Sequence, residues 1–177
     1  MPLINSKKDK VLELELRNKI FLLVSKFAGC HLRDLERKSN IPYTTLKYHL
    51  HFLVKNDLIL EKKEKGFDQY FPKEIKYEDI EILSLLRQTN IRRILLFLSI
   101  NVNSSFKDLE VFTKLLPSTL SFYLKKLIDN NIIKKSSISK SAKYSLIYSR
   151  DKIIKLIITY RESFLDTLID KTLEMWT

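Results

Sequence analysis

The chain is poor in the residues that interrupt or cross-link a fold. Its 177 residues include two glycines, four prolines and one cysteine. This scarcity of glycine and proline excludes long flexible or proline-stiffened linkers. The lone Cys30 has no partner for an internal disulfide, which fits a reducing compartment.

Long apolar runs are also missing. No uncharged stretch approaches the ~20 residues that a membrane-spanning helix needs. Residues 1–10 carry three lysines and no apolar core, so the sequence predicts no signal peptide. An apolar content of 45% with 30% charged residues is ordinary for a soluble globular protein. We therefore expect a cytoplasmic protein that binds no membrane.

Motifs for catalysis are absent from the sequence. It has no glycine-rich phosphate loop, no Gly-x-Ser-x-Gly element and no carboxylate pair in a setting that raises a pKa. The residues His31, His49, His51 and Cys30 invite a metal hypothesis. Their spacing does not support it, because His49 and His51 lie two apart on a helix and point in different directions. We expect no enzyme, cofactor, metal site or identifiable small-molecule effector, and a His49 packed in the core.

One stretch of the chain occurs twice, at a constant separation. Superposing residues 42–59 on residues 116–133 pairs Leu46 with Leu120, Leu50 with Leu124, Leu53 with Leu127, Asn56 with Asn130 and Ile59 with Ile133. We call the separation of Leu46 from Leu120 the repeat offset. The same offset pairs Ile20 with Ile94, Leu35 with Leu109 and Tyr70 with Tyr144. The sequence therefore predicts a duplicated module of about 70 residues.

Each copy is predicted to contain a helix, a short helix, a turn, a longer helix and a two-stranded hairpin. In the longer helix, Leu46, Leu50 and Leu53 follow the i, i+4, i+7 spacing of one buried face. Pro42 and Pro117 suit the starts of these helices. Other helices are expected at residues 10–28, 32–39, 77–87, 91–100 (capped by Thr89 or Asn90) and 151–176, and a further helix is expected after a cap at Ser104 or Ser105.

This order of elements resembles the winged helix-turn-helix, and specifically the ArsR-like modules paired in archaeal transcription regulators. The resemblance covers about residues 8–148 and rests on Thr-Leu-Lys-Tyr-His-Leu-x-x-Leu-x-x-x-x-Leu-Ile, starting at Thr45. Where the family usually has a glycine before the strand, this chain has Asp57 and Asn131, which tolerate the left-handed conformation. The resemblance implies a mainly α fold with small β wings (α+β): tandem domains at 1–73 and 74–149, then a C-terminal helix at 150–177.

The net charge of +11 is concentrated in the two modules. Residues 1–74 carry 15 Lys and Arg against 10 Asp and Glu, and residues 75–149 carry 12 against 6. Residues 150–177 carry 5 of each. A polyanion is the expected partner, because neutralising phosphates releases counterions. A lysine-rich surface also serves solubility or heat resistance, and composition alone leaves that alternative open.

The partner that the resemblance implies is double-stranded DNA. The outward face of each longer helix is assigned to the major groove, and the wings are assigned to phosphates. The expected DNA-binding residues are Tyr43, Thr44, Lys47, Tyr48 and His51 of the first helix, Lys62 and Lys63 of the first wing, Ser118, Ser121 and Lys125 of the second helix, and Lys134, Lys135, Lys140 and Lys143 of the second wing. The second wing is the better phosphate binder, because no acidic residue lies between Asn130 and Arg150.

Two other functions remain open on the sequence. Tandem winged helices also build protein-interaction scaffolds, in which the grooves bind other proteins. RNA is a weaker possibility, since aromatic side chains stack on unpaired bases.

The C-terminal helix is expected to hold a homodimer. It is neutral overall, and its apolar arc leaves Ile154, Ile158, Leu165 and Trp176 exposed in a monomer. The rival arrangement is a monomer whose C-terminal helix folds back over both modules.

Overall fold

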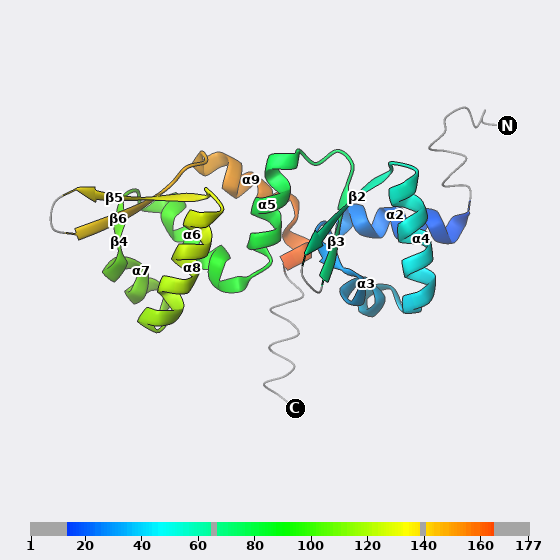
Figure 1. Ribbon diagram of the computed structural model, residues 1–177, viewed down its shortest axis with the longest axis horizontal. Coiled ribbons are helices and arrows are strands. Elements are labelled where there is room, and N and C mark those ends of the chain that lie inside the picture. The colour runs from blue at the N-terminus through cyan, green and yellow to red at the C-terminus, as the bar shows by residue number, and fades with distance from the viewer. Residues whose placement is uncertain (1–13, 65–66, 139–140, 165–177) are drawn as a thin grey trace. The chain divides into compact units, whose positions relative to one another are not determined.

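The computed structural model describes residues 14–64, 67–138 and 141–164, and the chain divides into two compact units, residues 1–80 and 81–177 (Figure 1). The division falls within helix α5 (Tyr77–Leu86). This helix was expected at residues 77–87. The domain limits expected at residues 73 and 149 stay predictions.

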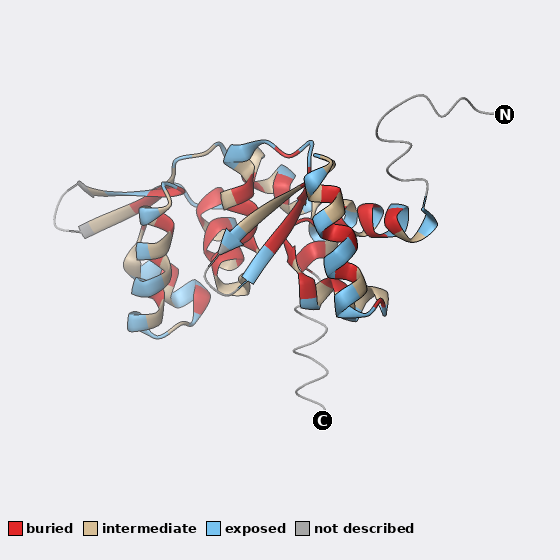
Figure 2. Ribbon diagram, turned by 45° about the vertical axis from the view of Figure 1, so that its right-hand side comes forward, coloured by how far each residue is buried: buried red, intermediate tan, exposed pale blue. Residues whose placement is uncertain are grey.

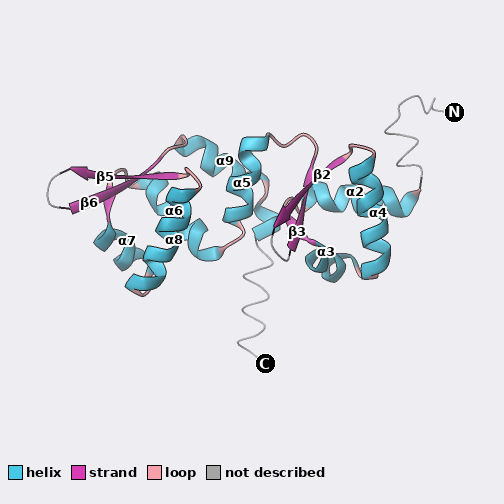
Figure 3. Ribbon diagram, viewed as in Figure 1, coloured by secondary structure: helices cyan, strands magenta, loops and turns pink. Residues whose placement is uncertain are grey.

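The first unit is a helical layer against a small antiparallel sheet (Figure 3). Its elements are α2 (Glu15–Lys26), β1 (Cys30–His31), α3 (Leu32–Ser39), α4 (Tyr43–Lys55), β2 (Ile59–Glu64) and β3 (Phe67–Pro72). The three strands are ordered β1-β3-β2, with Cys30 opposite Tyr70 and Ile59 opposite Pro72. The fold class is therefore α+β, as the sequence predicts.

The second unit has the same order of elements. After α5 it contains α6 (Thr89–Ile100), β4 (Ser104–Ser105), α7 (Phe106–Thr113), α8 (Pro117–Asp129), β5 (Ile133–Ile138), β6 (Ser141–Leu146) and α9 (Arg150–Thr159). Its sheet is ordered β4-β6-β5, with Ser104 opposite Tyr144 and Ile133 opposite Leu146. Each helix and strand from α2 to β3 thus has a counterpart of the same length one repeat offset further along the chain.

The backbone repeats as closely as the elements do. Positive φ angles occur at Gly29 and Asn103, at Asn40 and Lys114, and at Asp57 and Asn131, and the members of each pair are separated by the repeat offset. The expected left-handed conformation of Asp57 and Asn131 is confirmed, with φ of 60° and 54°. A short polar side chain lowers the cost of this conformation, so the turn into the hairpin forms without glycine.

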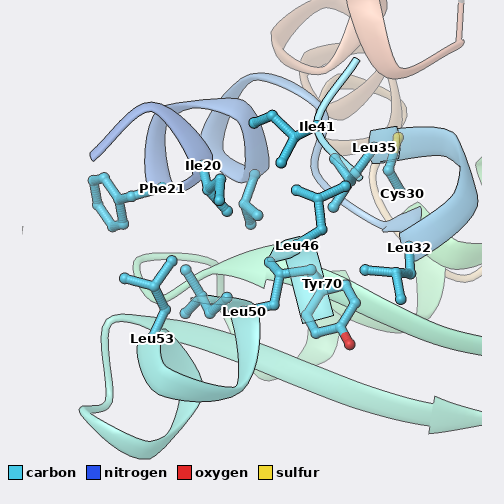
Figure 4. Close-up of a cluster of buried hydrophobic side chains, with 12 residues drawn as sticks. Ile20, Phe21, Cys30, Leu32, Leu35, Ile41, Leu46, Leu50, Leu53 and Tyr70 are labelled. Atoms are coloured by element: carbon cyan, nitrogen blue, oxygen red, sulfur yellow. The ribbon is translucent and has the colours of Figure 1, made fainter. Parts of the chain in front are cut away.

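The core of the first unit lies between α2, α4 and the sheet. Leu46, Leu50 and Leu53 are fully buried, as their spacing predicts, and they cluster with Ile20 and Tyr70 (Figure 4). Figure 2 shows α4 with one buried side and one exposed side. Packing of this leucine stripe therefore fixes which face of α4 is turned to solvent.

The structure tests three local expectations: the two hairpins, the cap of α6 and the cap of the helix after Ser105. Each expected two-stranded hairpin belongs to a three-stranded sheet, because the two-residue strands β1 and β4 add to its edge. Thr89 and Asn90 do not cap α6: they lie in its first turn, and Gln88 is the cap position, without a side-chain hydrogen bond. The cap at Ser105 is confirmed, since its Oγ accepts a hydrogen bond from the Asp108 N–H at 3.2 Å.

The single helix expected at residues 151–176 is interrupted within the described residues, and residues 165–176 lie outside them. Helix α9 ends at Thr159, where Tyr160 leaves helical geometry, and a short helical stretch comes after it at residues 161–164. The break brings the Phe164 ring to 5.1 Å from the Arg92 guanidinium, and Phe164 is buried there. Of the expected dimer residues, Ile154 is half-buried and Ile158 is exposed, whereas Leu165 and Trp176 lie outside the described residues.

Candidate nucleic-acid interface

The outward face of α4 carries the five side chains predicted to meet DNA. Tyr43, Thr44, Lys47, Tyr48 and His51 are all exposed, and Tyr48 is exposed over 63% of its surface. No Asp or Glu occurs in α4, whose other cation, Lys55, is also exposed. We call these five residues the α4 face. The face presents one cation, ring edges and hydroxyls, the groups that contact phosphates and base edges.

The start of α4 is fixed by the helix before it. A Glu36 carboxylate oxygen of α3 accepts a hydrogen bond from the Tyr43 N–H at 3.0 Å. In the turn between the helices, Ser39 Oγ donates to the Leu35 carbonyl and accepts from the Ile41 N–H. These bonds satisfy donors that a helix end leaves open, so they set the angle at which α4 leaves α3.

His49 lies on the inner side of α4, as predicted, and does not belong to the α4 face. It is buried, and its burial lowers the pKa of its imidazole below the usual 6.5, with the positive charge of Arg17 acting in the same direction. His49 is therefore neutral at pH 7 and packs as a core residue. Within the described residues, no group of three His, Cys, Asp or Glu side chains is placed to share a metal ion.

Acidification is expected to destabilise the first unit through His49. Because the folded pKa is the lower one, the unfolded chain binds more protons as the pH falls below 6.5, and stability is lost as the pH passes down through the folded pKa. The midpoint of thermal unfolding should fall more between pH 7.5 and 5.5 in the wild type than in His49→Gln. Equal slopes in the two proteins would contradict this role.

The first wing, β2 and β3, mixes both signs of charge. Lys63 is exposed, and its Nζ lies 3.6 Å from a carboxylate oxygen of Glu61. Lys62 is half-buried on the same strand, and Asp68 is exposed on the neighbouring strand. The two predicted phosphate-binding lysines of this wing therefore stand among carboxylates, which weakens their attraction for a polyanion.

A cleft of about 350 Å³ opens between the first wing and the starts of α3 and α4. It is lined by His31, Leu32, Arg33, Asp34, Arg37, Tyr43, Phe67 and Asp68. The His31 and Phe67 rings are 5.2 Å apart, and Arg37 pairs with Asp34 at 2.6 Å. Sequence reasoning missed Arg33 and Arg37 beside the α4 face, although their i, i+4 spacing on a short helix is a recognisable signal.

The outward face of α8 is less basic than that of α4. The predicted residues Ser118, Ser121 and Lys125 are exposed, and so is Phe122 over 62% of its surface. The Lys125 ammonium pairs with the Asp129 carboxylate at 3.0 Å. Because this carboxylate offsets the charge of Lys125, the outward face of α8 attracts a polyanion less than the outward face of α4 does.

The second wing, β5 and β6, is basic. Lys134 and Lys135 are exposed, Lys143 is half-buried, and Lys140 lies outside the described residues. Register places Lys134 and Lys143 on one face of the sheet, and Lys135 opposite Tyr144 on the other. Hydrogen bonds from Ser105 lower the pKa of the Asp108 carboxyl, and Lys143 adds to the shift, so part of this lysine's charge is used within the unit.

A second cleft, of about 400 Å³, joins α8 to this wing. It is lined by Ser121, Leu124, Lys125, Ile128, Asp129, Lys135 and Tyr144. Lys135 from the strand and Ser121 and Lys125 from the helix thus share one hollow. Two predicted DNA-binding surfaces, the helix and the wing, therefore meet in the second unit, with donors suited to an anionic oxygen.

Comparison with known proteins finds a relative that is named as a transcriptional regulator. No family model matches the chain. It is similar to an uncharacterized HTH-type transcriptional regulator of Methanocaldococcus jannaschii, MJ1398, with 31% identity over 149 residues. The match covers 83% of this chain and 36% of the relative, so the chain spans about a third of the relative's length.

Solved structures resemble the chain weakly. The DIP2311 protein from Corynebacterium diphtheriae matches 74% of this chain and 26% of its own, at 14% identity and a TM-score of 0.32. A structure of the ESCRT-II endosomal trafficking complex matches 82% of this chain and 70% of its own, at 16% identity and a TM-score of 0.28. Similarity at this level has no bearing on function. Among the described residues, no helix has the length and apolar character needed to cross a bilayer.

Proposed function

We propose that this protein is a sequence-specific transcription regulator that binds double-stranded DNA through two ArsR-like winged helix-turn-helix modules. In this proposal α4 and α8 enter the major groove, and the wings β2–β3 and β5–β6 hold phosphates. The modules correspond to residues 1–73 and 74–149. The protein acts in the cytoplasm, as a homodimer and without catalysis or a cofactor.

The observation that carries the proposal is the α4 face. Its five side chains are exposed although three of them are aromatic, and no carboxylate stands on the helix. Large exposed rings beside a lysine contribute little to the core of the first unit, and they suit the edges and methyl groups of bases. The printed name of the Methanocaldococcus relative, an HTH-type transcriptional regulator, supports the same general function.

The two units divide the work of binding. The α4 face supplies base contacts, because it combines Lys47 and Tyr48 on one exposed side of a well-anchored helix. The second wing supplies phosphate contacts through Lys134 and Lys135, which have no carboxylate on either strand of their hairpin. Helix α8 contributes less to binding, because its Lys125 is paired with Asp129. Its contact with DNA is the packing of Phe122 on a thymine methyl group.

Binding of fluorescent duplex at several salt concentrations tests the proposal. Affinity should fall steeply with salt, with a slope of log K against log salt on the order of −3 if Lys134, Lys135 and Lys143 of the second wing each neutralise one phosphate. A matched single-stranded RNA should bind more weakly than the duplex.

The alternative function is a protein-interaction scaffold, favoured by the exposed Phe122. It would show no salt-dependent binding to duplex and stable capture of a protein partner.

A further inference from the structure

The cleft between α8 and the second wing contains a buried tyrosine whose hydroxyl has no acceptor. We call this hollow of about 400 Å³ the α8–wing cleft. Tyr144 lines it with only 7% of its surface exposed. Among the residues that the structure describes, none accepts a hydrogen bond from the Tyr144 hydroxyl. Because a buried tyrosine hydroxyl usually has a partner, this one indicates a position for an atom of a ligand.

The first unit has an anion in the corresponding place. Tyr70 lies one repeat offset before Tyr144, and its hydroxyl donates to a Glu61 carboxylate oxygen at 3.3 Å. Glu61 is half-buried and stands opposite Tyr70 on the neighbouring strand. The buried tyrosine of the first unit therefore has an anionic acceptor that the chain itself supplies.

The second unit keeps the tyrosine and replaces the carboxylates around it. Lys135 stands opposite Tyr144 in the same register, at the position that Glu61 has in the first unit. Ala142 takes the position of Asp68, which adds to burial and Glu61 in raising the pKa of the first tyrosine. For Tyr144, burial raises the pKa and no carboxylate contributes. The second tyrosine thus has a lysine and an alanine where the first has two acids, and this change favours an anion from outside the chain.

The other polar groups of the cleft suit a phosphate oxygen. Lys135 is exposed and forms no ion pair with any described residue, and the Ser121 hydroxyl adds a neutral donor from α8. Two lysines and one aspartate line the cleft, and because Lys125 and Asp129 pair at 3.0 Å, the charge of Lys135 is left over. Hydrogen bonds from an ammonium group or a hydroxyl to a phosphate oxygen are short and strong.

We propose that the α8–wing cleft binds one phosphate group, one oxygen of which accepts a hydrogen bond from the Tyr144 hydroxyl while Lys135 and Ser121 donate to the others. The phosphate group then does for Tyr144 what the Glu61 carboxylate does for its counterpart in the first unit. A hollow of about 400 Å³ admits either a backbone phosphate of bound duplex or a free phosphorylated molecule. The first source rests on the proposed function, and the second does not.

The test measures phosphate binding without DNA. Inorganic phosphate is titrated into the isotope-labelled full chain and followed by NMR, with chloride keeping the ionic strength constant. The wild type should show saturable binding at one site, with a dissociation constant on the order of 1 mM. Tyr144→Phe keeps the ring and removes the donor, so it should weaken binding at least about tenfold. Lys135→Glu introduces the carboxylate of the first unit and should abolish saturable binding, because that group repels phosphate and competes for the hydroxyl.

The matched control is Lys134→Glu, which makes the same change of charge at the neighbouring residue. Lys134 is exposed on β5 and stands opposite Ser145, on the other face of the sheet from Tyr144. This control should keep the phosphate dissociation constant within about threefold at physiological ionic strength, because salt screens exposed charges. Circular dichroism should show all four proteins folded. A wild type without saturable binding, a Tyr144→Phe variant that binds as the wild type does, or equal losses in the two glutamate variants would each overturn the proposal.

A duplex titration distinguishes the two sources of the phosphate group. If a backbone phosphate of DNA enters the cleft, Tyr144→Phe should lower the affinity for duplex about tenfold and leave the salt slope unchanged, because tyrosine has no charge and releases no counterion. If the ligand is a free phosphorylated molecule, the same variant should bind duplex as the wild type does. Since the phosphate titration contains no DNA, failure of the proposed function would leave its result unchanged. Failure of the phosphate site, in turn, would leave duplex binding by the α4 face in place.

Discussion

Replacing Lys47 and Tyr48 together with alanine is expected to lower the discrimination between the specific site and random duplex by about ten- to a hundredfold. A good contact to a base edge discriminates by about 1–3 kcal/mol, and both side chains stand on the exposed side of α4. Affinity for random duplex should fall much less, because the phosphate contacts are proposed for the lysines of the second wing, which this variant keeps. Competition binding with specific and random duplexes measures both quantities.

The matched comparison removes two cations from the second wing. Lys134→Ala with Lys135→Ala should weaken binding to specific and random duplex by the same factor and make the salt slope shallower by about 2. Both lysines are exposed on β5, as Lys47 and Tyr48 are on α4, so neither variant should unfold its unit. Selective loss of specificity in the wing variant would reverse the assignment of helix and wing.

Much of the fold is readable from the sequence, because its information is local and occurs twice. The leucine stripe of α4 and its copy in α8 predict both the length of each helix and its buried side. The repeat offset, first visible in a few leucines, extends to the turns in the structure. Asp57 and Asn131 show that a side chain tolerant of positive φ identifies a turn even where glycine is absent.

Features that depend on distant partners were not predictable in the same way. The strand Cys30–His31 is too short to have a periodicity, and it exists because Tyr70 and Gln69 pair with it across the sheet. The stop of α9 at Tyr160 is equally non-local. No glycine or proline signals it, and beyond it Phe164 packs against Arg92 of α6, which is far away in the sequence.

The candidate site also has features that the sequence predicts and features that it does not. The exposure of the α4 face follows from helical spacing, and it was predictable residue by residue. The convergence of Arg33 and Arg37 with Tyr43 arises only when α3 packs beside the start of α4. The convergence of Lys135 with Lys125 arises only when the second wing folds beside α8. The ion pair between Lys125 and Asp129 could have been predicted from the sequence, because i, i+4 spacing on a helix brings opposite charges together.

The two units also allow a test that separates stability from recognition. Leu50 and Leu124 occupy matching positions on α4 and α8, and both are buried, at 0% and 2% exposure. Truncating a buried leucine to alanine costs about 2–5 kcal/mol, because apolar burial is lost and a cavity is left. Leu50→Ala and Leu124→Ala are therefore expected to lower the free energy of unfolding of their own units by similar amounts, as measured by urea denaturation.

Their effects on DNA should differ, although their effects on stability are alike. Leu50 anchors the helix that carries the α4 face, so its loss should lower discrimination between specific and random duplex. Leu124 anchors α8, which shares a cleft with Lys135 of the phosphate-binding wing and whose own Lys125 is paired with Asp129. Its loss should therefore disturb the wing and lower overall affinity, and leave discrimination nearly unchanged. Binding is measured below the unfolding transition of both variants, so that unfolded protein does not contribute. If Leu124→Ala reduced discrimination as much as Leu50→Ala, α8 would read bases as fully as α4, and the proposed division of work between the units would be wrong.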